Sequence, residues 1–333
     1  MIKRIGFACK WTDITPKGPV SDPLLNNRTT TVSWLKRQTR DEADKKLWEL
    51  MTHNLQAVYR LVERIGSLDR NCRMVRIGSD VLPVYTEPTF ASFYHDSSVR
   101  SYCEREFALI GQLARDLDVR LSFHPGQFCV LASDRPDVVE RSIEEFEYHV
   151  DMARWMGYGK TFQDFKINVH IAGRAGAQGI RAAYARLTPE ARNTITIENE
   201  EMIHGLDNCL TLTDIVPIVL DIHHHWVREA EYIQPQDDRC KRIEDSWRGV
   251  RPVIHYSVSR EDYLVNHAVD QLPDGVMLLE AGYKKAKLRA HSDQYWNTAV
   301  NDWALSFADR SDIMCESKLK NLASLPLASQ LLA

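Results

Sequence analysis

The chain has 333 residues, of which 44% are hydrophobic, and its 42 lysine and arginine residues are slightly outnumbered by 46 aspartate and glutamate residues. This length fits two domains or one α/β barrel with insertions. The formal net charge of -4 excludes a cationic field over the whole protein. A nucleic-acid partner would therefore have to meet a local basic patch.

The cysteine pattern and the hydropathy indicate the compartment. Seven cysteines, an odd number with no Cys-x-x-Cys spacing, predict reduced thiols. The N-terminus is too poor in apolar residues for a signal peptide, and no stretch approaches the length of a membrane span. We therefore expect a cytoplasmic monomer with no membrane partner.

Short strand-like runs alternate with helical patterns along the chain. The eight strand-like runs are residues 4–9, 74–77, 119–124, 167–171, 194–198, 217–222, 252–256 and 276–280. The clearest helical patterns are residues 40–65, 99–117, 136–156 and 179–187. Eight parallel strands with helical crossovers predict the fold class α/β, a single-domain (β/α)8 TIM barrel over residues 1–323 with a loosely held tail at 324–333. A doubly wound sheet is less favoured, because no Gly-x-Gly-x-x-Gly motif follows a strand.

Histidines and carboxylates follow these runs at their carboxyl ends, where barrels build their sites. They are His124, His170, Glu198, Asp221 with His224, His255 and Glu280. Each alone is more often a hydrogen-bonded polar side chain, and the three consecutive histidines 223–225 could be a solvated cluster. A whole series converging on one mouth is hard to explain without cations, because burying so much charge is costly.

The donor set indicates which metal is expected. Nitrogen and carboxylate oxygen donors without thiolates suit manganese or zinc better than magnesium, and do not separate the first two. His267 is a candidate for a further ligand. Its Asn-His-Ala-Val context fits a residue on the surface of a helix equally well.

Several motifs resemble one family, the UV damage endonucleases, which are relatives of endonuclease IV among the metal-dependent barrels. The resemblance covers nearly the whole chain. The motifs lie at residues 26–31 (NNRTTT), 75–83 (VRIGSDVLP), 121–128 (LSFHPGQF), 138–143 (VVERSI), 197–199 (IEN), 220–224 (LDIHH), 254–257 (IHYS) and 277–281 (MLLEA).

The resemblance implies three metal sites, two to three bound cations with Mn2+ the most expected, and a catalytic group formed by Glu198, Asp221, His255 and Glu280. The implied ligands are His124, His170 and Glu198 for the first site, Glu198, Asp221, His255 and Glu280 for the second, and His224 and His267 for the third. It also implies that Gln127 and Phe128 wedge into the duplex where damaged bases are turned out.

Several positions depart from the family pattern close to the expected site, among them Glu200 and Glu201, where the family usually has two aspartates. Phe7 and Trp11 stand where the family usually has a tyrosine and an asparagine, and Glu87 replaces a frequent histidine. Val253 stands where the family has a modified lysine that serves the third site. These changes bear on the range of lesions and on the third site, which we expect to be weak or empty because a valine cannot bind a cation.

The predicted function is metal-assisted hydrolysis of a phosphodiester in double-stranded DNA, 5′ of a UV photolesion, leaving 3′-hydroxyl and 5′-phosphate ends. Lys10, Arg28 and Arg76 are candidates for holding phosphates. Competing hypotheses are an abasic-site endonuclease or related hydrolase, a damaged-DNA-binding protein with reduced turnover, and a two-metal sugar isomerase. The isomerase would have no use for an exposed Gln-Phe wedge.

Overall fold

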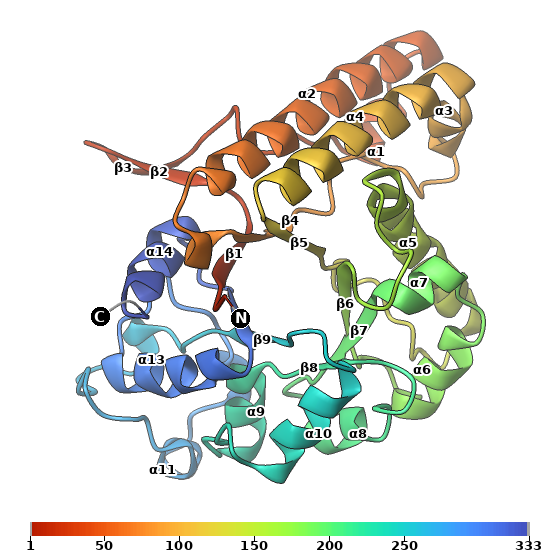
Figure 1. Cartoon of the computed structure of the whole chain (residues 1–333). Helices are drawn as coiled ribbons and strands as arrows, with labels where there is room; N and C mark the ends of the chain where they lie inside the picture. The colour runs from red at the N-terminus through yellow and green to blue at the C-terminus, as the bar shows by residue number, and fades with distance from the viewer. Residues whose placement is uncertain (1, 332–333) are drawn as a thin grey trace.

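The computed structural model describes residues 2–331 and contains eight parallel strands arranged around a central axis (Figure 1). In sequence order they are β1 (Ile5–Cys9), β4 (Met74–Ile77), β5 (Arg120–Phe123), β6 (Lys166–His170), β7 (Ile195–Glu198), β8 (Ile218–Val219), β9 (Val253–Tyr256) and β10 (Asp312–Cys315). Their order in the sheet is β8-β7-β6-β5-β4-β1-β10-β9. The backbone N–H of His255 donates to Leu220 O at 2.9 Å, which brings β9 against the end of β8 and closes the barrel.

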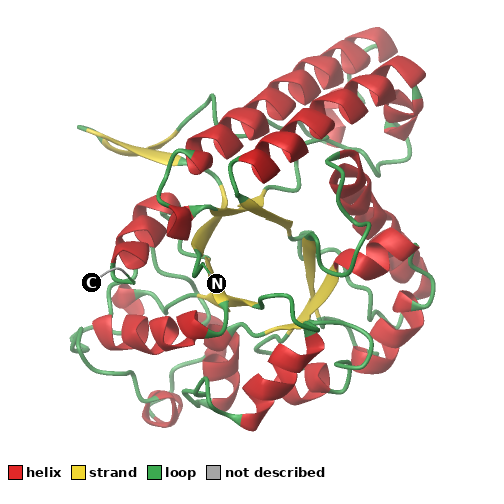
Figure 2. Cartoon of the chain, in the orientation of Figure 1, coloured by secondary structure: helices red, strands yellow, loops and turns green. Residues whose placement is uncertain are grey.

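Helices surround the strands on the outside of this barrel (Figure 2). The longer ones are α2 (Arg40–Gly66), α4 (Ser97–Asp116), α5 (Pro136–Trp155), α6 (Gly176–Tyr184), α9 (Ile222–Glu229), α10 (Asp238–Ser246), α13 (Thr298–Leu305) and α14 (Asn321–Ser329). The shorter ones are α1 (Val32–Leu35), α3 (Ala91–His95), α7 (Pro189–Thr194), α8 (Leu206–Leu210), α11 (Gly275–Glu280) and α12 (Lys285–Leu288), with 3-10 turns η1 (Arg70–Cys72), η2 (Glu261–Tyr263) and η3 (Ser306–Asp309). The predicted barrel is confirmed.

The first long helix shows how local sequence sets these boundaries. Thr39 begins α2 with a capping box, in which its side chain accepts from the N–H of Glu42 and the Glu42 carboxylate accepts from the N–H of Thr39. Leu47, Met51 and Leu55 then recur at helical spacing and are buried. This apolar stripe packs α2 onto the sheet and beside α4 (Figure 1).

The eighth strand is not where the sequence predicted it. Residues 276–280 belong to helix α11, where the Asp274 side chain accepts from the N–H of Met277 and where Val276 and Met277 are exposed. The eighth strand is β10, whose four residues are all buried between β1 and β9. A short apolar run has the same composition in a buried strand and in a single helical turn, so periodicity does not separate them.

The C-terminal segment is also better ordered than expected. Residues 324–329, predicted to be part of a loose tail, lie in helix α14, which packs against β1 and buries Leu327 and Ala328. This part of the prediction is wrong, because a helix in this place covers the outside of the first strand. Residues 332–333 lie outside the described part of the chain.

Two long segments follow strands at the carboxyl end of the barrel. One follows β1 and contains a hairpin of β2 (Thr12–Thr15) and β3 (Gly18–Ser21), which projects from the barrel in Figure 1. The other joins β9 to α13 and contains η2, α11 and α12. In the described chain, most exposed large apolar side chains lie in segments that follow strands: Ile14, Val20, Leu24, Phe128, Met202, Ile203, Val265, Val269, Leu272, Val276 and Met277. Such a rim of apolar groups is typical of an interaction face.

Candidate functional site

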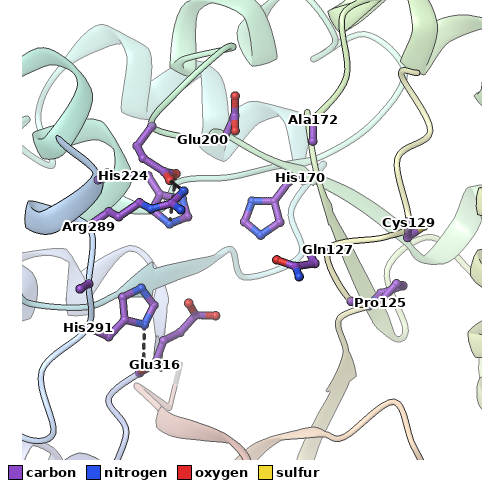
Figure 3. A pocket seen from close by; sticks show the side chains of 14 residues that line it. Pro125, Gln127, Cys129, His170, Ala172, Glu200, His224, Arg289, His291 and Glu316 are labelled. Carbon is purple, nitrogen blue, oxygen red and sulfur yellow. Dashed lines mark hydrogen bonds and ion pairs between the residues drawn. The ribbon is translucent and has the colours of Figure 1, made fainter. Parts of the chain in front are cut away.

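A pocket of about 590 Å³ lies at the carboxyl end of the barrel (Figure 3). Histidines, carboxylates and one arginine line it together with the loop that follows β5. The residues labelled in the view are Pro125, Gln127, Cys129, His170, Ala172, Glu200, His224, Arg289, His291 and Glu316. The strand ends therefore deliver their polar side chains into one cavity, as expected for a barrel.

Three groups of these side chains bring ligand atoms within 4.8 Å of one another. The groups are His124, His170 and Glu198; His124, His255 and Glu316; and Glu198, Asp221 and His224. Six of the eight predicted metal ligands are therefore brought together in the structure. Imidazole nitrogens and carboxylate oxygens are donors that suit manganese or zinc.

Glu198 belongs to two of these groups and is fully buried. Its Oε2 is 3.3 Å from His124 Nε2, and its Oε1 is 3.1 Å from His255 Nδ1 and 3.7 Å from His224 Nδ1. Burial alone would raise the pKa of this carboxyl, but the imidazoles of His255 and His170 hold it well below its usual range. Glu198 is therefore charged, and its two oxygens face His124 and His255.

Glu316 takes the place that the sequence assigned to Glu280. It follows β10 directly, and its Oε1 lies 3.4 Å from His255 Nδ1. Glu280 is exposed on α11 and belongs to none of the three groups found in the described chain. The rule that ligands follow strands would have found Glu316 if Ile313-Met314-Cys315 had been recognised as a strand.

Arg76 is ion-paired through its guanidinium with the Glu316 carboxylate. Its side chain is only 14% exposed. Burial would raise the pKa of Glu316, but the Arg76 charge keeps it well below the usual range. Arg76 therefore holds Glu316 in the charged form beside His255, and the phosphate-binding role expected of Arg76 stays a prediction.

Asp221 and His224 enter the site from the start of α9. Asp221 caps this helix, and its Oδ1 accepts from the N–H of His224 at 2.7 Å. The other oxygen, Oδ2, is buried and has no hydrogen-bond partner among the described residues. Burial and the nearby Glu198 raise the pKa of Asp221, whereas the surrounding carboxylates outweigh burial and raise the pKa of His224 to about 9. An unpartnered oxygen pointing at this cluster fits a cation.

The residues expected at a third metal site do not come together. His267 Nε2 is 2.9 Å from Gln271 O in the segment after η2, and His267 belongs to none of the groups found among the described residues. Val253 is buried at the start of β9 and offers no donor. His224 instead faces Glu201 Oε2 at 3.7 Å. A third site built on His224 and His267 is therefore not assembled in this structure.

The segment after β5 places Gln127 and Phe128 at the mouth. The Phe128 side chain is 86% exposed, and the exposed Gln127 lines the pocket beside His170 (Figure 3). Lys10 and Arg28 are exposed in the segment after β1. Phe128 is therefore an exposed side chain and not part of the core, and the wedge that the resemblance implied stays a prediction.

The other departures from the family pattern have local explanations. Phe7 and Trp11 are buried and meet edge to face, with ring centroids 5.8 Å apart. Glu87 pairs with Lys36 at 3.2 Å and caps the turn at Thr89. These three side chains therefore belong to packing and turn structure in the described chain.

Fold and site together define an α/β barrel with a candidate metal centre at its carboxyl-end mouth. The family model described as UV-endonuclease UvdE matches residues 3–333. The chain therefore belongs to the UV-endonuclease UvdE family and is a DNA repair endonuclease.

Within the described residues, no helix is long and apolar enough to cross a membrane.

Known relatives agree with this family over almost the whole chain. A UV DNA damage endonuclease of Bacillus cereus is 24% identical over 319 residues, which cover 92% of this chain and 89% of the relative. One of Bacillus velezensis is 24% identical over 346 residues, covering 100% and 95%.

Two solved structures share the fold. The crystal structure of SacUVDE has a TM-score of 0.72 with 22% identity and covers 99% of this chain and 98% of its own. Endonuclease IV from Thermus thermophilus has a TM-score of 0.54 with 11% identity, covering 83% and 94%.

Because Glu316 belongs to a candidate ligand group and the exposed Glu280 does not, variants of these two glutamates form a matched pair. We expect Glu316→Gln to lower Mn2+ affinity at least 10-fold, because the site loses a charged ligand oxygen, a loss on the order of 1.4 kcal/mol or more. Glu280→Gln should bind Mn2+ like the wild type. Titration of both proteins with Mn2+ against a competing chelator checks this, and equal affinity of the two variants would contradict the assignment of Glu316.

Proposed function

We propose that this protein is a metal-dependent endonuclease that hydrolyses a phosphodiester of duplex DNA on the 5′ side of UV photolesions, leaving 3′-hydroxyl and 5′-phosphate ends. The observation that carries this proposal is the position of Glu198, which belongs to two of the three groups and whose two oxygens face His124 and His255. A carboxylate shared in this way can hold two neighbouring cations.

The charge of the pocket supports the requirement for cations. Glu198, Glu201 and Glu316 all have lowered pKa values because nearby imidazoles or arginines outweigh the effect of burial. Their negative charges would repel a phosphate in this cavity. Bound divalent cations, Mn2+ by preference, would reverse that repulsion, stabilise charge on the phosphate oxygens and lower the pKa of water at the site.

The chain's own residues orient the reaction around these cations. His124, His170 and Glu198 would hold one cation. Two further groups could hold another, His124 with His255 and Glu316, and Glu198 with Asp221 and His224. Arg289, half exposed and paired with Glu201 at 2.6 Å, lies at the rim of the same pocket. It is placed to meet a phosphate oxygen and exchange its partner when DNA enters.

Lesion recognition would use the exposed pair after β5. A damaged step is cheaper to unstack than an intact one, and an inserted apolar side chain can fill the gap that an extruded base leaves. Phe128, 86% exposed and next to Gln127 at the pocket, has the position for this role.

A basic segment beside the pocket supplies the local patch that the net charge requires. Residues 281–291 contain three lysines and one arginine and no acidic residue. Lys284 and Lys287 are exposed, and Ala286, Arg289, Ala290 and His291 of the same segment line the pocket. We assign the contacts to the phosphates of the DNA backbone to this segment, together with Lys10 and Arg28 and in place of Arg76.

The reaction itself is tested with purified protein, Mn2+, and three duplexes: irradiated, abasic and intact. We expect nicks on the 5′ side of photolesions in irradiated DNA, with 3′ ends that a polymerase extends. Glu198→Ala should abolish nicking, because the cations lose their shared ligand. Retention of irradiated DNA without nicking would indicate a damage-binding protein, and cleavage of abasic DNA alone would indicate an abasic-site endonuclease.

The wedge is tested by replacing Gln127 and Phe128 together with alanine. This variant should lose its preference for irradiated over intact duplex while it keeps its bound metal, since loss of stacking costs about 1–3 kcal/mol per base. Competition binding between the two duplexes measures the preference. Unchanged discrimination would show that the wedge lies elsewhere.

The basic segment is tested through the salt dependence of binding to intact duplex. Lys284→Ala with Lys287→Ala should weaken binding and flatten the plot of log affinity against log salt by about 0.9 for each lost phosphate contact. The matched control is Lys45→Ala with Lys46→Ala on α2, outside the barrel. Equal slopes for both variants would place the DNA on another face.

A further inference from the structure

Lys166 is a buried lysine that the proposed reaction does not use. It is the first residue of β6, and it is the single lysine among the buried polar and charged side chains of the described chain. Its Nζ lies 3.0 Å from His255 Nε2. No ion pair joins it to a carboxylate among the described residues, although buried cations are usually paired.

The neighbouring strand shows how a cation is normally accommodated at this end of the barrel. Arg120, the first residue of β5, pairs with the fully buried Asp312 at 2.7 Å, and Arg251 pairs with the same carboxylate at 2.7 Å. Lys166 has no such partner and contacts an imidazole instead. A side chain that is costly to bury and is not compensated by an opposite charge indicates a functional constraint.

The contact with Lys166 determines which nitrogen of His255 faces the metal ligands. His255 Nδ1 lies 3.1 Å from Glu198 Oε1 and 3.4 Å from Glu316 Oε1, whereas Nε2 points to Lys166 on the opposite side of the ring. Rotation of the ring by 180° about the Cβ–Cγ bond would place Cδ2 near the carboxylates and Cε1 near Lys166, and it would break both contacts. The lysine therefore selects the orientation that presents Nδ1 to the carboxylates.

Strand β6 supports the site at three successive levels. His170 at its end belongs to a ligand group, and Asn168 Nδ2 donates to Glu198 Oε2. Thr196 Oγ1 donates to Asn168 Oδ1 at 2.7 Å and fixes that amide. Lys166, two residues earlier, contacts His255. Alternation along one strand thus places a ligand, a support for Glu198 and a support for His255 on the same face.

We propose that Lys166 is a positioning residue of the candidate metal centre, which holds His255 from the amino-terminal end of β6 so that Nδ1 faces Glu198 and Glu316, where a cation would bind. This inference rests on the proposed metal-binding role of the site. Lys166 is not a ligand itself and acts through His255. Partners that orient a ligating histidine typically change metal affinity about 10–100-fold when they are removed.

Lys166→Met tests the proposal because it keeps an unbranched side chain that is one atom shorter and removes the nitrogen. The apo protein should be at least as thermally stable as the wild type, since the variant no longer buries an unpaired amine. Mn2+ titration against a chelator should show one site weakened about 10–100-fold and the other retained. Lys166→Gln, which keeps a hydrogen-bonding group, should recover part of the affinity.

The control is Ser122→Ala on the adjacent strand β5, whose buried hydroxyl has no hydrogen-bond partner among the described residues. It should leave both Mn2+ affinities unchanged. A purely structural role for Lys166 would instead give a less stable apo Lys166→Met protein with unchanged Mn2+ affinities, and that result would overturn the proposal. Mn2+ titration does not depend on DNA, so failure of the wild type to nick irradiated duplex remains a separate result.

Discussion

The site depends on a negative charge that is buried at the end of a strand. Glu198 has no contact with solvent, and it stays ionised because imidazoles surround it and Asn168 donates to it. Every other element of the mouth is arranged around this charge: two strands bring His124 and His255 to its oxygens, and α9 brings His224. Removing the charge would leave several partly buried imidazoles without a partner. The packing at this end of the barrel and the geometry of the site therefore depend on the same carboxylate.

The same region carries groups that are costly for folding. Asp221 has a buried oxygen without a partner in the described chain, and Lys166 is buried without a carboxylate. Burial lowers the pKa of Lys166 to about 7, which reflects the cost of a charge in this position. Apolar strands and helices around the barrel stabilise the fold enough to hold these groups, which is the usual relation between a scaffold and its active centre.

Charge is distributed unevenly over the molecule. The chain as a whole is slightly acidic, and the pocket collects carboxylates, yet residues 281–291 at its rim contain lysines and an arginine and no acidic residue. A carboxylate-lined pocket inside a basic rim would suit the polyanion of the proposed reaction, because the rim would attract the DNA backbone and the pocket would accept one phosphate with cations bound. Exposed apolar side chains such as Phe128 on the same face suit contacts with bases.

The sequence by itself determined the barrel, seven of its strands and most of the candidate ligands that the structure brings together, because alternation and strand ends are local patterns that depend on few neighbours. It did not identify β10 or Glu316, since a run as short as Ile313-Met314-Cys315 is a strand only when two other strands flank it. Tertiary structure alone decided that Arg76 pairs with Glu316 and that Lys166 meets His255, residues that are 240 and 89 positions apart. Closure of the barrel brings such residues together, and no local pattern encodes which side chains will meet across it.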